Sequence, residues 1–262
     1  MRLRHRAGTA VSLTFDNLGE VTDLERGEWP DDEPLGHHFS VTRALPRILE
    51  LLDELGLHAT FFVEGLNTEL YPDTLRELDA AGHEVAYHGW RHEPWAGLDP
   101  GTEWELLERG VRRMGDLGIE LAGFRPPGGD LTSASLELLR DLGFAYCSPA
   151  GAGVRGGDVV VLPFHWRLLD AFHYLPRFAP RRERELGSGE PLSPERLRAT
   201  VFAALEEAVR ERGFLSLLFH PFLAEPEERF AVIREVLERV RALDHGGALW
   251  CAPCREIAAA VR

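Results

Sequence analysis

Short apolar runs alternate with longer stretches of helical periodicity along almost the whole 262-residue chain, and this alternation limits the possible folds more than any other feature. Apolar runs bounded by turn residues indicate strands, and apolar residues three or four positions apart indicate helices. The expected strands are Val11–Phe15, His58–Val63, His83–His88, Ala122–Arg125, Phe144–Ser148, Val159–Phe164, Phe214–His220 and Ala248–Cys251. The expected helices are Val41–Leu55, Pro72–Ala81, Thr102–Leu117, Ser133–Leu142, Pro194–Arg212, Glu227–Leu243 and Arg255–Val261.

Strands that alternate with helices in this way pair in parallel through right-handed crossovers, which predicts an α/β fold. About seven or eight strand–helix repeats favour a barrel over an open sheet, because single α/β barrels commonly occupy roughly 250 residues. The irregular stretch Pro176–Pro191 is expected to be a solvated loop or lid, because regular structure resumes directly after it. We therefore expect one domain over residues 1–262.

The charged residues exclude several classes of chemistry. The chain has 29 Lys and Arg against 43 Asp and Glu, for a net charge of −14, and all of its cations are arginine. Without lysine there is no Schiff base, no pyridoxal phosphate linkage and no phosphate-loop lysine. The negative net charge also disfavours nucleic acid as a partner, because a polyanion meets repulsion.

The sequence carries no recognisable export or membrane signal. Met1–Thr9 is basic but lacks the long apolar segment of a secretory signal peptide, and no stretch approaches the roughly 20 apolar residues of a membrane span. Three cysteines are too few for a disulfide framework. We expect a cytoplasmic protein that does not associate with membranes.

Two of the cysteines lie in a motif that indicates a competing function. WCAPC at Trp250–Cys254 matches the local pattern of a thioredoxin-type redox centre. Only eight residues follow Cys254 in the sequence, which is too few for the rest of such a fold. We therefore expect Cys251 and Cys254 to be structural.

Polar residues stand at the carboxyl ends of most of the expected strands, which is the rim where α/β barrels carry their reactive groups. They are Asp16, Asn17, Glu64, His88, His92, Arg125, His165 and His220. The spacing of His88 and His92 is typical of two metal ligands, although such pairs also occur in solvated loops. A carboxylate, an arginine and several imidazoles on one rim indicate catalysis or metal binding.

Four ordered motifs resemble those of the polysaccharide deacetylase family, the NodB-homology carbohydrate esterases. They are TFDN at Thr14–Asn17, HGWRH at His88–His92, RPPGG at Arg125–Gly129 and LLFH at Leu217–His220. Three further segments resemble the branch of the family with intracellular-type peptidoglycan deacetylases and metal-independent, allantoinase-like amide hydrolases. They are Leu162–Tyr174, His220–Phe222 and Ala248–Ala258. The resemblance implies a distorted (β/α) barrel of about seven parallel strands and a hydrolase of carbon–nitrogen bonds other than peptide bonds.

The resemblance also implies roles for the motif residues. Asp16 corresponds to the general base that takes a proton from water, and His220 corresponds to the general acid that protonates the leaving amine. His88 and His92 correspond to two ligands of a divalent metal ion, usually zinc, which polarises the amide carbonyl.

The remaining assignments concern orientation and substrate. Arg125 corresponds to the arginine that orients the base, Gly128 lies near the expected oxyanion, and Asp170 is expected to be a partner of Arg125. Trp90 and Trp166 are candidates for stacking on a sugar ring, although aromatic side chains there could equally close the barrel mouth. We expect a small-molecule or oligosaccharide substrate.

One residue departs from the family pattern. Asn17 stands where the family has an aspartate as its third metal ligand, and an amide is a poorer zinc ligand than a carboxylate. Asn17 could bind through its carbonyl oxygen, or an acid such as Glu20, Glu64 or Asp16 could replace it. The histidine pair favours a metal-dependent N-deacetylase of an N-acetylated sugar or related small amide. The alternatives are a metal-independent hydrolase of a cyclic amide or ureide, and an inactive carbohydrate-binding barrel.

Overall fold

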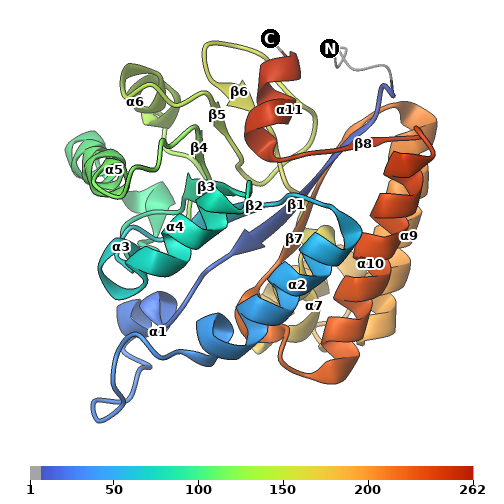
Figure 1. Ribbon diagram of the computed structural model, residues 1–262, viewed down its shortest axis with the longest axis horizontal. Helices are drawn as coiled ribbons and strands as arrows, with labels where there is room; N and C mark the ends of the chain where they lie inside the picture. The colour runs from blue at the N-terminus through green and yellow to red at the C-terminus, as the bar shows by residue number, and fades with distance from the viewer. Residues whose placement is uncertain (1–6, 262) are drawn as a thin grey trace.

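A curled parallel sheet forms the centre of the molecule, which a computed structural model describes over residues 7–261 (Figure 1). Its strands are β1 (Ala10–Asp16), β2 (Thr60–Val63), β3 (Glu84–Tyr87), β4 (Gly123–Phe124), β5 (Tyr146–Cys147), β6 (Val160–Val161), β7 (Phe214–Phe219) and β8 (Trp250–Cys251). The first seven lie side by side in the order β6-β5-β4-β3-β2-β1-β7, and β8 pairs with the beginning of β1. All of these ladders are parallel. The predicted distorted (β/α) barrel is confirmed, although several strands are shorter than predicted.

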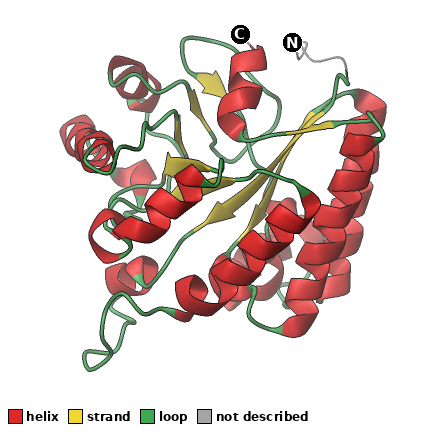
Figure 2. Ribbon diagram, viewed as in Figure 1, coloured by secondary structure: helices red, strands yellow, loops and turns green. Residues whose placement is uncertain are grey.

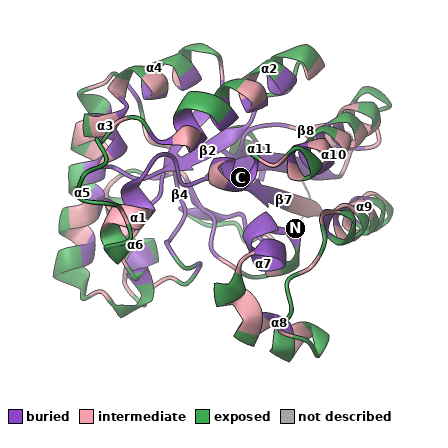
Figure 3. Cartoon of the chain, turned by 90° about the horizontal axis from the view of Figure 1, so that it is seen from below, coloured by how far each residue is buried: buried purple, intermediate pink, exposed green. Residues whose placement is uncertain are grey.

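Helices surround this sheet (Figure 2), most of them on its outer side, whereas the last helix of the chain packs across one end of the barrel (Figure 3). They are α1 (Val21–Arg26), α2 (Leu45–Leu55), α3 (Asn67–Leu70), α4 (Pro72–Ala80), α5 (Pro100–Gly115), α6 (Ser135–Asp141), α7 (Asp170–Tyr174), α8 (Ala179–Leu186), α9 (Pro194–Glu211), α10 (Glu227–His245) and α11 (Cys254–Val261). A π-helical turn (Ser40–Ala44) and four 3₁₀ turns (Trp95–Gly97, Trp166–Leu168, Pro176–Phe178, Pro221–Leu223) join them. The predicted helices are all present. The short helices α1, α3, α7 and α8 escaped prediction, because helices of this length show too little periodicity.

The first strand shows how the sequence places polar groups inside the barrel. All residues of β1 are buried, although the strand alternates between apolar and polar side chains. Val11, Leu13 and Phe15 pack in the main hydrophobic core. The intervening side chains point to the opposite face of the sheet, because successive residues of a strand alternate in direction. There Thr14 Oγ1 accepts a hydrogen bond from Arg125 at 3.0 Å, so the barrel interior is polar at this level.

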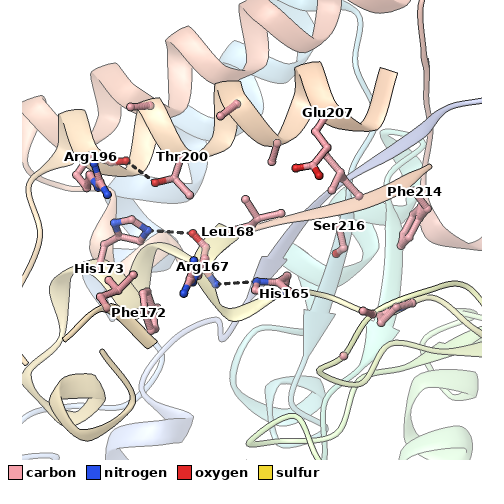
Figure 4. Close-up of a pocket in the computed structure, with 18 of the residues that line it drawn as sticks. His165, Arg167, Leu168, Phe172, His173, Arg196, Thr200, Glu207, Phe214 and Ser216 are labelled. Carbon is pink, nitrogen blue, oxygen red and sulfur yellow. Dashed lines mark hydrogen bonds between the residues drawn. The ribbon is translucent and has the colours of Figure 1, made fainter. Parts of the chain in front are cut away.

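The two ends of the strand row do not pair over a ladder. Within residues 7–261, β6 forms no ladder with β7, and the segment that follows β6 meets β7 at a single bridge from Leu169 to Leu218. A cavity of about 570 Å³ lies beside this gap, between α9 and β7 (Figure 4). His165, which sequence analysis placed among the strand-end candidates, lines this cavity and not the separate cavity that is lined by Asp16, Asn17, His88, His92, Arg125 and His220.

The stretch Pro176–Pro191, predicted to be a solvated loop or lid, is largely exposed, but the expectation that it is irregular is wrong. The structure forms the 3₁₀ turn Pro176–Phe178 and the helix α8 there, at the edge of the molecule (Figure 3). Arg182 of α8 is fully buried. Its guanidinium donates hydrogen bonds of 2.6, 2.9 and 2.8 Å to the carbonyl oxygens of Phe172, Leu175 and Gly189. Because buried donors require partners, these bonds hold the segment against the barrel.

The WCAPC segment is packed into the barrel at its C-terminal helix. Cys254 begins α11, its backbone N–H donates to Thr60 Oγ1 at 2.8 Å, and its Sγ lies 3.1 Å from Ser12 Oγ. Burial raises the pKa of Cys254 to about 11. A thiol of this kind is a weak nucleophile at neutral pH, which agrees with a structural role.

Within residues 7–261, no helix is both long enough and apolar enough to cross a membrane. The prediction drawn from Met1–Thr9 concerns mainly residues 1–6, which lie outside the described residues. The domain limits predicted above also include residues 1–6 and 262, which lie outside them as well.

Candidate active site

The carboxyl ends of the strands meet at one cavity of about 390 Å³. Asp16 ends β1, and His88 directly follows β3. Arg125 directly follows β4, and His220 directly follows β7. These four residues line the cavity, and we call them the cavity floor. Parallel strands present their carboxyl ends at one edge of the sheet, so the fold brings together residues from both halves of the chain.

A buried ion pair joins Asp16 to Arg125 on the cavity floor. Arg125 Nη1 lies 2.7 Å from Asp16 Oδ1, and the two side chains are only 1% and 5% exposed. The remaining guanidinium nitrogens donate to the hydroxyls of Ser148 and Ser216, so the buried charge is well satisfied. Burial raises the pKa of Asp16, while the charges of Arg125 and His220 oppose that rise. Since Arg125 engages Oδ1, Asp16 Oδ2 is left as the proton-accepting oxygen.

Two neutral imidazoles lie beside this ion pair. His88 Nδ1 lies 2.8 Å from the carbonyl oxygen of Arg125. A carbonyl can only accept, so Nδ1 carries the proton and Nε2 keeps a lone pair, 3.8 Å from Asp16 Oδ2. The ring centroid of His92 lies 4.9 Å from that of His88. Burial lowers the pKa of His88 to about 3 and that of His92 well below its usual value, so both rings are uncharged at neutral pH.

A buried carboxyl group outside the motifs holds Asn17. Asn17 has a left-handed φ of 64°, which asparagine tolerates better than most residues. Its Nδ2 donates to Glu64 Oε1 at 2.5 Å. Glu64 is fully buried and also accepts hydrogen bonds from Leu18 N and Asn67 Nδ2. Burial raises the pKa of Glu64 to about 8. With the amide nitrogen turned toward Glu64, the Asn17 carbonyl oxygen is the atom left for a ligand.

Asp170 lies at the site, but its predicted partner was wrong. Asp170 Oδ1 lies 2.6 Å from His220 Nδ1, and Asp170 Oδ2 accepts the backbone N–H of His220 at 2.8 Å. Arg125 is instead bonded to Asp16, Thr14 and two serines. The two bonds from Asp170 fix the orientation of the His220 ring and protonate its Nδ1, so that Nε2 is the nitrogen available for proton transfer.

The structure separates the three candidates for substrate contact. Gly128 and Trp166 line the cavity. Gly128 has a φ of 78°, a conformation that favours glycine. Trp90 does not line the cavity, so its prediction as a substrate contact is wrong. Its ring is buried, with the Arg109 guanidinium carbon 3.5 Å from the ring centroid, and it packs against Gly65.

A model of the polysaccharide deacetylase family matches residues 4–147, which is more than half of the chain. The chain belongs to the polysaccharide deacetylase family. The resemblance seen in the motifs is thereby confirmed. The matched region contains five of the candidate residues: Asp16, Asn17, His88, His92 and Arg125. His220 lies beyond it.

Individual relatives agree with this family assignment. A peptidoglycan deacetylase from Helicobacter pylori is 32% identical over 118 residues, which cover 45% of this chain and 40% of the relative. The chain thus spans less than half of that relative's length. A structure from Mycobacterium smegmatis assigned to the polysaccharide deacetylases has a TM-score of 0.82 at 29% identity, over 100% of this chain and 93% of that one. The Puue allantoinase structure has a TM-score of 0.78 at 17% identity, over 99% and 93%, and shows a shared fold.

The polysaccharide deacetylase family implies a divalent metal ion, and the donor atoms of the cavity fit one. His88 and His92 offer neutral imidazole nitrogens, and Asn17 offers an amide oxygen. Within residues 7–261, no group of three or more His, Cys, Asp and Glu side chains is arranged to hold a metal. Glu20 accepts hydrogen bonds from Gly36 and Tyr71, and Glu64 lies behind Asn17. The third protein ligand would therefore be Asn17, and a wholly neutral donor set of this kind binds a divalent ion weakly.

Sequence reasoning missed the basic residues at the mouth of this polysaccharide deacetylase cavity. Four arginines line it, and we call them the rim arginines: Arg26, Arg177, Arg181 and Arg184. Arg26 ends α1, Arg177 lies in the 3₁₀ turn that precedes α8, and Arg181 and Arg184 lie three residues apart on one face of α8. The signal was present in the sequence, but a run rich in arginine and glutamate is usually a solvated surface.

Proposed function

We propose that this protein is a hydrolase of carbon–nitrogen bonds other than peptide bonds, which removes the acetyl group from an N-acetylated sugar or a related small amide. One observation carries the proposal: a carboxylate held by Arg125 and a histidine held by Asp170 line the same cavity. Membership of the family and the similarity to a peptidoglycan deacetylase support it. We further propose that residues 1–262 form a single catalytic domain.

Asp16 acts as the general base in this proposal. Arg125 holds Oδ1 at 2.7 Å, which leaves Oδ2 to accept a proton from the attacking water. Burial raises the pKa of Asp16 and so makes it a stronger base than an exposed aspartate. As the proton moves to Oδ2, the water oxygen forms a bond to the carbonyl carbon of the amide.

His220 acts as the general acid. It enters this step as the imidazolium, with Nδ1–H bound to Asp170, so that Nε2–H is the group that can donate a proton into the cavity. When the tetrahedral intermediate collapses, the carbon–nitrogen bond breaks and the proton from Nε2 goes to the leaving amine. The products are acetate and a free amine. Gly128 lines the same cavity and would offer its backbone N–H to the developing oxyanion.

The metal ion that the family implies would be held by His88, His92 and Asn17, with zinc as the expected ion. When bound, it would supply Lewis-acid polarisation of the amide carbonyl. The protein prepares these ligands by neutralising both imidazoles through burial and by turning the Asn17 nitrogen toward Glu64. Groups behind the ligands commonly fix their orientation in this way.

Acetate release tests the proposed function. Purified protein is incubated with zinc and with N-acetylglucosamine oligosaccharides, and acetate is measured for the wild type, Asp16→Asn and the exposed control Asp73→Asn, whose side chain is 87% exposed. We expect release by the wild type and the control, and a loss of about 10³-fold in Asp16→Asn. Equal release by Asp16→Asn would remove the assigned base. Sugar binding without acetate release by any of the proteins would indicate an inactive carbohydrate-binding barrel.

A second candidate function is metal-independent hydrolysis of a cyclic amide or ureide. The amide at Asn17 favours it, because a neutral ligand in place of a carboxylate weakens a metal site. Treatment with a strong chelator, followed by acetate and ring-opening assays, distinguishes the two functions. Loss of activity that zinc restores supports the metal-dependent deacetylase. Full activity after the chelator removes bound metal supports the second candidate.

A further inference from the structure

The mouth of the active-site cavity is strongly positive in a protein that is acidic overall. The whole chain carries a net charge of −14, yet four rim arginines and Arg125 line this cavity. Among residues 7–261, Asp16 is the only acidic residue that lines it, and Arg125 engages that carboxylate at 2.7 Å. The positive charge of the rim is thus not balanced by acidic groups inside the cavity.

The rim arginines also lack close acidic partners elsewhere in the described chain. Among them only Arg181 forms an ion pair, with Nη1 3.7 Å from Glu185 Oε1. Within residues 7–261, Arg26, Arg177 and Arg184 have no carboxylate oxygen within 4.0 Å. Most other surface arginines in the described chain do have a carboxylate oxygen within 4.0 Å. Packing and the nearby Arg26 charge lower the pKa of Arg177 to about 10, although Glu28, Asp23 and Asp170 act in the opposite direction at longer range.

The rim is held in place by the fold. Arg182 anchors α8 from the barrel side through its bonds to buried carbonyl groups. On the cavity side, the Arg181 guanidinium lies 4.2 Å from the ring centroid of Trp166. Keeping several like charges around one small cavity costs free energy, which a negatively charged occupant would offset.

We propose that the substrate is a small N-acylated amine that also carries an anionic group, a phosphate or a carboxylate, and that Arg177, Arg184 and Arg26 bind this group while the amide lies on the cavity floor. The inference rests on the proposed function. Arginine binds both anions through paired N–H donors. The cavity volume of about 390 Å³ suits a small molecule, since such pockets measure roughly 300–1,000 Å³.

Matched ligands test this proposal. Binding of N-acetylglucosamine 6-phosphate, N-acetylmuramic acid and neutral N-acetylglucosamine is measured by calorimetry. The proteins are the wild type, Arg177→Gln/Arg184→Gln, and the control Arg43→Gln/Arg210→Gln. The control removes two equally charged side chains that are 65% and 68% exposed and lie outside the cavity. Both pairs change the net charge equally, so only the position of the lost charges differs.

We expect at least one anionic sugar to bind the wild type and the control at least tenfold more tightly than the neutral sugar. This preference should shrink to less than threefold in Arg177→Gln/Arg184→Gln. A stronger preference for the phosphate or for the carboxylate identifies the anion. Equal or undetectable binding of all three sugars by the wild type, or a preference retained in the rim variant, would overturn the proposal.

Acetate release from the same three sugars is measured in parallel. A binding preference that depends on the rim arginines, without any acetate release, contradicts the proposed function alone. Equal acetate release from all three sugars contradicts the anion proposal alone.

Discussion

The floor and the rim of the cavity are built in opposite ways. On the floor, four side chains are almost fully buried, and each is fixed by at least one hydrogen bond with another buried group: Asp16, His88, Arg125 and His220. On the rim, Arg177 and Arg184 are exposed and have no close acid in the described chain. The difference matches the two proposed roles. Groups that must hold a catalytic geometry to within fractions of an ångström are buried and hydrogen-bonded, whereas the arginines proposed to bind the substrate's anionic group are exposed and have no close carboxylate of their own.

The first prediction, with the largest effect of the four that follow, concerns Asp170, which positions His220 on the floor. Asp170→Asn should lower kcat about 100-fold, because the His220 ring loses the carboxylate that fixes its tautomer. KM should stay within threefold for both neutral and anionic sugars, since the rim is untouched. The measurement is steady-state acetate release with Asp73→Asn as control. A change in KM for the anionic sugar alone would show that Asp170 acts in anion binding, together with the rim arginines, and not through His220.

The second prediction concerns metal affinity on the floor. Asn17→Asp introduces a negatively charged ligand beside His88 and His92, so zinc should bind at least tenfold more tightly, as measured by competition with a chelator. His88→Gln should weaken zinc binding instead. If Asn17→Asp left the zinc affinity unchanged, Asn17 would not be a ligand.

The third prediction concerns the anchor of the rim. Arg182→Gln leaves buried carbonyl groups without their donors, which costs about 1–3 kcal/mol locally. Amide hydrogen exchange over residues 176–191 should accelerate, and the preference for an anionic sugar should fall while acetate release from the neutral sugar is retained. The neighbouring substitution Arg184→Gln should leave the exchange rates unchanged. Unaltered exchange in Arg182→Gln would show that the rim does not depend on this anchor.

The last prediction concerns stability and lies outside both regions, at the opposite end of β3 from His88. Burial lowers the pKa of His83 to about 4, and its Nδ1 accepts the backbone N–H of Ala59 at 3.3 Å. The unfolded chain, with an ordinary histidine pKa near 6.5, takes up the proton first. The stability contribution is therefore complete above pH 6.5 and is lost as the pH falls toward 4.

Between pH 7 and pH 5 the protonation of this histidine in the unfolded chain should lower the free energy of unfolding by about 2 kcal/mol, an effect that urea denaturation can resolve. His83→Gln should show a flatter dependence of the unfolding free energy on pH over the same range. An identical pH dependence in the wild type and His83→Gln would assign the acid sensitivity to other groups, such as those on the floor.

The fold and most of the floor were accessible from sequence, because both depend on local patterns. The alternation of strands and helices predicted the parallel barrel, and strand ends predicted that Asp16, His88, Arg125 and His220 would meet. Each of these residues directly ends or follows a strand, so its position along the chain places it at the carboxyl edge of the sheet.

The features that sequence analysis missed depend on the direction in which a side chain turns. Arg182 and Arg184 belong to one arginine-rich run, yet the first is buried and the second lines the cavity mouth. Trp90 was a candidate for stacking on a sugar ring, but its buried side chain packs against Arg109 instead. Asp170 was matched with the wrong partner, because its bond to His220 spans 50 residues and leaves no local signal.

The division between floor and rim is tested most directly by one crossed measurement of acetate release. Asp16→Asn and Arg177→Gln/Arg184→Gln are compared with the wild type on N-acetylglucosamine and on its 6-phosphate, each at a subsaturating concentration. We predict that Asp16→Asn lowers the rate about 10³-fold for both sugars, whereas the rim variant lowers it at least tenfold for the phosphate alone. A wild-type rate in Asp16→Asn, or an equal loss for both sugars in the rim variant, would contradict the account.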